Sequence, residues 1–269
     1  MLVDSHCHLN FPDLASRMDD VRANMAANAV SHALLIGVNR PDYPAELFDH
    51  ILRFVKEKEL AWDCGTGNGQ SAVPLSERFT KVYATDISRK QLDHAAQNLR
   101  IEYVLEPAEQ TSLSDHSVDL ITVAQAIHWF KFDAFYKEVR RVAKPGAVIA
   151  VWAYSLLRIS GSIDLILDNY HNNTLGPYWD PERKYVDDGY ASIPFPFAPL
   201  ETPSFSIERN WSLKDMEGYL DTWSALQKYQ AVHSENPVPG IIAAVSGYWG
   251  AEEKRKVIFP VHLRLGFVE

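Results

Sequence analysis

A glycine-rich run that follows a short apolar stretch constrains the fold of this chain more than any other segment. Residues 60–63 are apolar up to an acid, and Asp63-Cys64-Gly65-Thr66-Gly67-Asn68-Gly69 follows directly. In open α/β sheets, ligands bind where such a loop joins the carboxyl end of a strand to the next helix. Glycines there adopt positive φ and let the backbone approach a ligand closely. The run therefore predicts a strand, a ligand-binding loop and a helix.

The alternation of predicted strands and helices around this loop indicates a parallel sheet. Helical periodicity and stop signals predict helices over 41–56, over 89–99 with Ser88 as N-cap, and over 132–142, which Lys144-Pro145-Gly146 ends. Short apolar runs predict five strands, at residues 60–63, 81–86, 101–105, 118–124 and 147–154. Alternating strands and helices are typical of an α/β fold wound around a parallel sheet.

The pattern changes after residue 154. Residues 155–203 are rich in Pro, Tyr, Trp and Asn, which predicts an insertion over the sheet, placed where a lid would lie. Residues 205–209 and 261–267 predict two further strands, with helical stretches around 213–229 between them. We expect these two strands to close the sheet as an antiparallel pair.

Two acids flank the glycine loop in the predicted sheet. Asp63 can accept hydrogen bonds from an ammonium group or order the amides of the loop. Asp86 ends the second strand, 23 residues later (86 − 63), where a carboxylate can hold both hydroxyls of a ribose, and Ile87 can pack on an adenine. A nicotinamide dinucleotide site is disfavoured, because its G-x-G-x-x-G pattern needs glycine where this chain has Gln70.

From about Arg40 to the end, the chain resembles class I S-adenosylmethionine-dependent methyltransferases. The resemblance rests on Asp-x-Gly-x-Gly-x-Gly, on Asp86, on Ala108-Glu109 after the third strand and on Asp119-Leu120-Ile121 opening the fourth. It implies a Rossmann-like seven-stranded methyltransferase sheet with helices on both faces, and S-adenosylmethionine as cofactor. The cofactor-binding residues that it implies are Arg40, Asp63, Gly65, Gly67, Gly69, Asp86, Ile87, Ala108, Glu109 and Gln125. A glycine turn in an unrelated α/β protein is the alternative, which four motifs in the right order disfavour.

A finer pattern is similar to the methyltransferase type 11 or trans-aconitate methyltransferase-like branch. It consists of residues 40–44, Gln-Ala-Ile-His-Trp-Phe at 125–130, and Trp-Ser-Ala at 223–225. Members of that branch methylate small molecules, some at carboxylates, which implies a small-molecule acceptor. The departure lies upstream, because relatives carry an aromatic-containing cap segment where this chain has residues 37–39.

The pocket chemistry leaves few candidates. Methyl transfer from a sulfonium is an in-line displacement, which needs alignment and no covalent nucleophile. His128 is the one candidate for a general base; it could instead order its loop, and an ionised carboxylate acceptor needs no base. Trp129 and Trp152 are the candidates for acceptor contact, although aromatic residues at such positions often pack in the core.

Residues 1–39 differ from a methyltransferase cap. Val3-Asp4-Ser5-His6-Cys7-His8 resembles the opening strand of TatD-type metal-dependent hydrolases, and a helix over 19–28 and a strand over 33–38 complete an N-terminal β-α-β fragment. The other metal ligands of that family have no match here, so we predict a non-catalytic fragment without a metal site. The junction near residue 39 is either natural or an artificial chimera.

Charge and composition narrow the partners. The formal net charge of −9 and the isoelectric point near 5.6 disfavour nucleic acid. Two distant cysteines and no apolar run of membrane-spanning length predict a cytoplasmic protein with no membrane partner. Three hypotheses remain: a small-molecule methyltransferase, a cofactor-binding but inactive methyltransferase damaged by the junction, and a remnant of a metal-dependent hydrolase.

Overall fold

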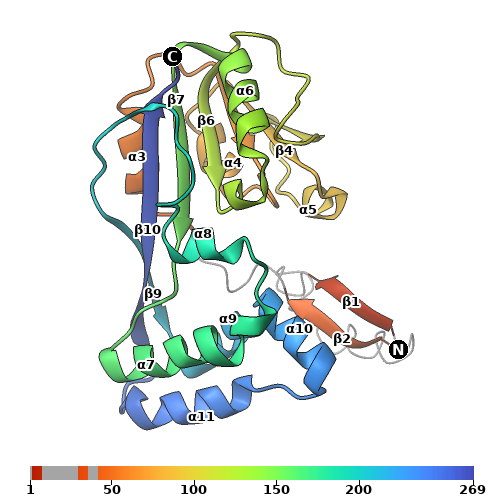
Figure 1. Ribbon diagram of the computed structural model, residues 1–269, viewed down its shortest axis with the longest axis vertical. Helices are drawn as coiled ribbons and strands as arrows, with labels where there is room; N and C mark the ends of the chain where they lie inside the picture. The colour runs from red at the N-terminus through yellow and green to blue at the C-terminus, as the bar shows by residue number, and fades with distance from the viewer. Residues whose placement is uncertain (1, 8–29, 36–41) are drawn as a thin grey trace. The chain divides into compact units, whose positions relative to one another are not determined.

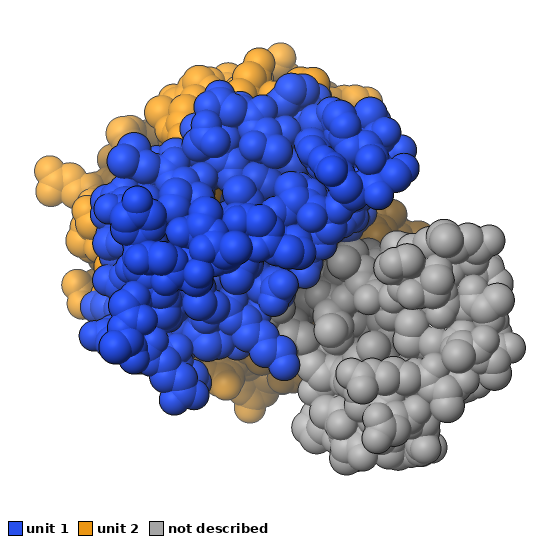
Figure 2. Space-filling view, turned by 90° about the horizontal axis from the view of Figure 1, so that it is seen from below, with its two compact units in different colours: residues 1–41, 158–180, 209–257 blue, residues 42–157, 181–208, 258–269 orange. Residues whose placement is uncertain are grey.

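The computed structural model describes residues 2–7, 30–35 and 42–269. The chain divides into two compact units, which Figure 2 colours blue and orange. Unit 1 comprises residues 1–41, 158–180 and 209–257, and unit 2 comprises residues 42–157, 181–208 and 258–269. Within the described ranges, every helix is too short or too polar to cross a lipid bilayer.

Unit 2 is built on the large sheet of the molecule. The sheet has eight strands in the order β5-β4-β3-β6-β7-β10-β8, with β9 beside β10. Neighbours from β5 to β7 are parallel, whereas β10 runs antiparallel to β7 and β8; the blue β10 lies beside the green β7 in Figure 1. The strands are β3 Leu60–Cys64, β4 Lys81–Asp86, β5 Ile101–Leu105, β6 Val118–Ala124, β7 Ala143–Tyr154, β8 Ala198–Pro199, β9 Phe205–Trp211 and β10 Arg255–Phe267.

Helices cover both faces of this sheet. Trp62 lies in register with Ile149 through β6, and it packs edge-on against Phe135 of α6 (Phe132–Val142) with ring centroids 6.0 Å apart. Trp152 is three residues from Ile149, so it projects from the opposite face. There it packs edge-on against Phe48 of α3 (Ala45–Leu52), at 6.0 Å. The predicted Rossmann-like sheet with helices on both faces is thus confirmed, with the two-residue β8 as an eighth strand.

The strand order places β3 at the point where the chain changes direction across the sheet. From β3 the chain adds β4 and β5 on one side, then crosses to add β6 and β7 on the other. Asp119 at the start of β6 ties the two halves together, because its Oδ2 accepts hydrogen bonds from the amides of Glu59 (3.0 Å) and Leu60 (2.9 Å). Lys144 pairs with its Oδ1 at 2.7 Å. Ligands of open α/β sheets bind at such a switch point.

Most predicted elements are confirmed, with changes at their ends. The helix predicted over 89–99 is shorter, α5 Arg89–Asp93, but Ser88 caps it as predicted, accepting from the Gln91 amide at 3.4 Å. The predicted helix stop at 144–146 lies inside β7, where Gly146 has φ +79° and the register with β6 shifts. The strand therefore accommodates Pro145 and Gly146 in a local irregularity, and its pairing with β6 continues beyond them. Unit 2 also contains the helices α4 Ala72–Ser76 and α8 Arg183–Asp187.

Unit 1 is mainly helical. Ser212 and Asp215 form a capping box at the start of α9. Tyr170 stacks on Trp223 with ring centroids 5.7 Å apart. The helical stretch predicted around 213–229 is two helices, and the insertion predicted over 155–203 divides between the two units; its role as a lid stays a prediction. The helices are α7 Gly161–Asn169, the π-helix η2 Tyr170–Thr174, the 3-10 turn η3 Gly176–Tyr178, α9 Leu213–Leu220, α10 Ser224–His233 and α11 Val238–Trp249.

The N-terminal fragment is described in part. Strands β1 Leu2–Cys7 and β2 Val30–Leu35 form a parallel two-stranded sheet. The strand predicted over 33–38 overlaps β2 but begins later and ends later. The predicted helix over 19–28 lies outside the described residues.

Candidate active site

The glycine loop after β3 opens onto free space at one position. Gly65 and Gly67 have φ values of +67° and +58°, a region that residues with a Cβ rarely adopt. A Cβ on Gly65 would lie 2.5 Å from the Cβ of Ala126, so Gly65 is required by packing. A Cβ on Gly67 would meet no atom within 4 Å. The backbone at Gly67 is therefore accessible to a ligand.

Asp63 is buried at the centre of the site. Its carboxylate accepts hydrogen bonds from the hydroxyls of Thr122 (2.7 Å) and Thr66 (2.6 Å), which join β3 to β6 and to the loop. Burial raises the pKa of Asp63 to about 6, against the opposing effect of these two hydrogen bonds. Through these hydrogen bonds Asp63 orders the glycine loop, which is one of the two roles predicted for it from the sequence.

Asp86 at the end of β4 contacts the glycine loop. Its Oδ2 accepts from the Gly67 amide and its Oδ1 from the Ser88 amide, both at 2.8 Å. Each carboxylate oxygen can accept a further hydrogen bond, so both stay competent to bind a diol. Ile87 next to it is 76% exposed, as a residue that packs on a flat ligand would be.

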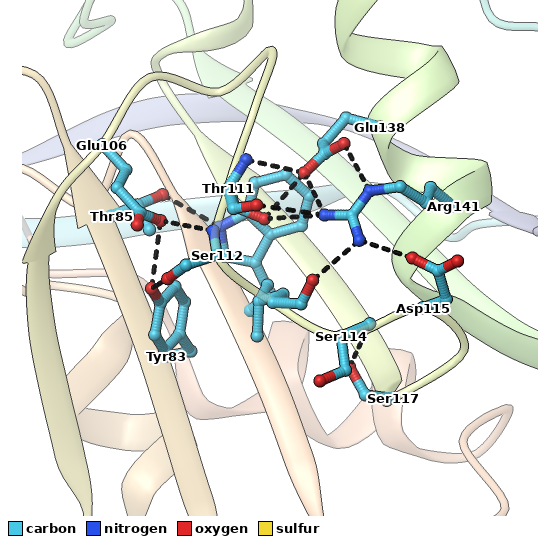
Figure 3. Close-up of polar contacts among 12 residues, drawn as sticks. Tyr83, Thr85, Glu106, Thr111, Ser112, Ser114, Asp115, Ser117, Glu138 and Arg141 are labelled. Atoms are coloured by element: carbon cyan, nitrogen blue, oxygen red, sulfur yellow. Dashed lines mark hydrogen bonds and ion pairs between the residues drawn. The ribbon is translucent and has the colours of Figure 1, made fainter.

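The loop after β5 is fixed by a polar network, shown in Figure 3. Glu138 of α6 is buried; it accepts from the Thr111 amide and hydroxyl, both at 2.7 Å, and from two nitrogens of Arg141, at 2.6 and 2.9 Å. Arg141 also donates to the Leu113 carbonyl and to Asp115, both at 2.7 Å. Burial alone would raise the pKa of Glu138, but the hydrogen bonds from Arg141 and Thr111 lower it.

The same loop carries two predicted cofactor residues. Ala108 is buried, and Glu109 accepts a hydrogen bond from the Lys131 amide at 2.9 Å, just before α6. Glu106 accepts from the Tyr83 hydroxyl (3.0 Å) and the Ser112 amide (3.1 Å), a contact also drawn in Figure 3. The Glu138–Arg141 network and Glu106 thus fix the segment that presents Ala108 and Glu109. Sequence reasoning missed this support, since its polar residues have no distinctive spacing.

Gln125 joins two strand ends. It follows β6 with φ +55°, and its side chain pairs with the backbone of Tyr154: Nε2 donates to the carbonyl at 3.2 Å, and Oε1 accepts from the amide at 3.0 Å. The predicted contact of Gln125 with a cofactor stays a prediction, and these hydrogen bonds support a structural role.

The aromatic candidates occupy different environments. Trp129 in the 3-10 turn η1 (Ile127–Trp129) is 58% exposed, and His128 beside it is buried with Nδ1 2.8 Å from the hydroxyl of Tyr190. Trp152 is fully buried and packs edge-on against Tyr43, at 5.5 Å, as well as against α3. Its predicted acceptor contact stays untested, and its burial indicates a packing role. Burial lowers the pKa of His128 to about 4.

Two residues named in the sequence analysis cannot be placed in the site. Arg40, predicted to bind the cofactor, and His8 of the N-terminal fragment lie outside the described residues. Across ranges 2–7, 30–35 and 42–269, no cluster of three or more His, Cys, Asp or Glu side chains is arranged to hold a metal ion.

Comparison with known proteins gives a consistent result. The family model described as a methyltransferase domain matches residues 62–151. A Dictyostelium discoideum protein named as a methyltransferase is 35% identical over 234 residues, which cover 84% of this chain and 89% of that protein. An uncharacterized methyltransferase of Mycobacterium tuberculosis is 37% identical over 164 residues, covering 60% of this chain and 62% of its own.

The solved structures include a similar fold. The structure of a protein from Anaeromyxobacter dehalogenans, described as a type II methyltransferase, superposes with a TM-score of 0.80 and 39% identity. The match covers 85% of this chain and 98% of that one. None of these relatives supports the resemblance of residues 1–39 to TatD-type hydrolases.

Proposed function

Because this chain belongs to the class I S-adenosylmethionine-dependent methyltransferases, we propose that its acceptor is a small molecule that is methylated at a carboxylate. The observation that carries the site assignment is the open backbone of Gly67 held against Asp86. The acceptor class rests on the finer resemblance around residues 125–130, and the net charge of −9 disfavours nucleic acid as the acceptor.

The residues present fit S-adenosylmethionine. Gly67 leaves room for a ligand against the backbone, and Asp86 keeps acceptor capacity on both oxygens for the ribose hydroxyls. In this proposal the exposed Ile87 packs on the adenine, and the loop of Ala108 and Glu109 lies along its edge. Asp63 holds the glycine loop in shape and supplies negative charge at the strand end.

Methyl transfer requires no covalent catalysis by the protein. S-adenosylmethionine supplies a methyl group on positively charged sulfur, and the protein must orient the acceptor in line with it and exclude water. When the acceptor is a carboxylate, a carbon–oxygen bond forms as the carbon–sulfur bond breaks, and no proton is released. No general base is therefore required, in agreement with a His128 that burial makes a weak base by lowering its pKa to about 4.

The acceptor in this proposal is neither nucleic acid nor a membrane lipid. A net charge of −9 repels phosphate backbones unless a local basic patch overrides it. The exposed Trp129 beside the site offers a flat apolar surface for a compact acceptor.

The competing hypotheses are not favoured. A damaged, inactive methyltransferase would have to lose a site in which Asp63, Gly67 and Asp86 are joined by hydrogen bonds and backbone geometry. The relatives named above are all described as methyltransferases, and none supports a hydrolase remnant.

One experiment tests the proposal in two steps. Isothermal titration with S-adenosylmethionine measures cofactor binding, and formation of S-adenosylhomocysteine is then measured with a panel of small mono- and dicarboxylic acids, amines and, as the macromolecular control, tRNA. We expect turnover with at least one acid. Turnover with tRNA or with amines alone would overturn the acceptor class, and absence of cofactor binding would overturn the site assignment.

A further inference from the structure

His128 lies in the turn η1, next to the glycine loop. It belongs to the segment that follows β6, the strand beside β3. That segment packs on the loop, because a Cβ on Gly65 would lie 2.5 Å from Ala126 and 3.1 Å from the ring of Phe130. His128 is therefore held between two residues that contact the cofactor loop.

Tyr190 positions the His128 ring. Its hydroxyl lies 2.8 Å from Nδ1 of His128, and its side chain is fully buried. Its backbone has φ +64°, a strained value for a residue with a Cβ, and its carbonyl accepts a hydrogen bond from Arg264 at 2.8 Å. The surrounding structure thus holds the phenol in one place.

The direction of this hydrogen bond follows from the proton inventory. A neutral imidazole carries one N–H, and a phenol carries one O–H. If Nδ1 donated to the phenol, the buried phenol proton would have no acceptor among the described residues. A buried donor without an acceptor is costly, so the phenol of Tyr190 donates to Nδ1, and the ring proton resides on Nε2 of His128.

We infer that Tyr190 fixes His128 as an Nε2–H donor that binds an oxygen of the acceptor carboxylate, so that His128 positions the acceptor and removes no proton from it. The inference rests on the proposed function for its acceptor class. Nε2 makes no hydrogen bond with the described part of the chain, and 8% of the residue is exposed. Arg183 of α8 (Arg183–Asp187) pairs with Asp187 at 2.9 Å, and its charge also lowers the His128 pKa, after burial. An N–H donor such as Nε2 forms its stronger hydrogen bonds with an ionised oxygen, which a carboxylate supplies.

The tautomer of His128 can be measured without an acceptor. Long-range proton–nitrogen correlation spectra of protein labelled with nitrogen-15 histidine distinguish the two neutral tautomers, and the His128→Gln spectrum assigns the signals. We expect the Nε2–H tautomer in the unaltered protein and its loss or mixing in Tyr190→Phe. Tyr136→Phe is the matched control, because Tyr136 is also buried and donates to a backbone carbonyl, that of Pro194. An Nδ1–H tautomer, or a spectrum unchanged by Tyr190→Phe, would overturn the inference.

The kinetics separate a donor from a base. Using the most active carboxylic acid of the panel, we expect KM to rise about tenfold in Tyr190→Phe and more in His128→Leu, while the Kd for S-adenosylmethionine changes less than about twofold. His128→Gln keeps an N–H near the same place and should lose less than His128→Leu. Equal losses in those two variants would overturn the donor role.

The outcomes distinguish this inference from the function on which it rests. A wrong tautomer alongside turnover of carboxylic acids would overturn the inference and leave the proposed function standing. Cofactor binding without turnover of any acid would overturn the acceptor class and, with it, the contact assigned to His128.

Discussion

At the residue scale, the site depends on carboxylates whose environments differ. Asp63 is buried and accepts from two threonine hydroxyls, whereas Asp86 is partly exposed and accepts from two backbone amides. Burial favours the neutral form of an acid, and it raises the pKa of Asp63. The first is suited to holding the loop and the second to binding hydroxyl groups.

Cofactor affinity should depend on the protonation of Asp63. Its pKa is raised by burial from 3.8 to about 6, so Asp63 gains a proton as pH falls through 6 and loses its attraction for the positively charged cofactor. We expect the Kd for S-adenosylmethionine to be about tenfold weaker at pH 5 than at pH 7.5. Isothermal titration across this range measures it. Asp63→Asn should abolish the dependence; a dependence that survives in this variant would assign it to another group.

Asp86→Ala should weaken cofactor binding at least roughly tenfold, because hydrogen bonds to a charged group contribute about 1.5–3 kcal/mol. The substitution also frees the Gly67 amide that Asp86 now holds. Isothermal titration of the variant measures the loss, with exposed Asp93→Ala on α5 as control. An unchanged Kd in folded Asp86→Ala would reject the ribose role.

Two glycines allow strain to be separated from ligand contact. Gly67 and Gly146 both have positive φ and open space where a Cβ would stand. Alanine at either position should destabilise the protein by about 1–2 kcal/mol through the left-handed backbone. Only Gly67→Ala should also weaken cofactor binding, as thermal unfolding and isothermal titration on both variants would reveal. Equal affinities of the two variants for the cofactor would show that Gly67 does not contact it.

At the element scale, the loop after β5 depends on α6 for its shape. Arg141→Gln removes the partner of a buried carboxylate, and we expect the free energy of unfolding to fall by about 1–3 kcal/mol, a value reduced because Arg141 is partly exposed. Cofactor binding should weaken several-fold as the loop carrying Glu109 loosens. Chemical denaturation and titration measure both effects.

The same variant has a predictable pH signature. The pKa of Glu138 is lowered, so its contribution to stability is present above its ordinary value and is lost as pH falls through the lower folded value. The stability difference between the unaltered protein and Arg141→Gln should therefore shrink in acid. Lys137→Gln, at an exposed position on α6, is the control and should show neither effect. A difference that stays constant down to pH 3 would mean that the Glu138–Arg141 pair is not its source.

The elements themselves were largely predictable. The strands at 81–86 and 118–124 follow from mainly apolar runs, because a strand covered on both faces is buried along most of its length. The edge strand at 101–105 was also predicted, although it is only partly buried. The glycine loop and Asp86 were predictable because both follow strand ends. The Glu138–Arg141 network was not, since polar residues on a helix are normally exposed. The His128–Tyr190 contact joins residues 62 positions apart, which no local pattern encodes.

At the scale of the whole molecule, the N-terminal segment should contribute no chemistry. We expect the double variant His6→Ala with His8→Ala to leave cofactor affinity, methyl transfer and thermal stability nearly unchanged, because the other ligands of a hydrolytic site have no match in the sequence. Metal analysis of the purified protein and a phosphodiesterase assay check this. Stoichiometric metal that the double variant loses would show that the segment binds metal.

The strand order also has a consequence for how the protein folds. β3 and β6 lie side by side although their ends are joined by contacts that span 59 and 60 residues, from Leu60 and Glu59 to Asp119. Such distant pairings close a long loop and form slowly. A nascent chain that has exposed only the glycine loop and Asp86 still lacks the Thr122 hydroxyl that holds Asp63. Cofactor therefore stabilises only molecules in which both halves of the sheet have joined, and it acts as a selective ligand for the fully folded state.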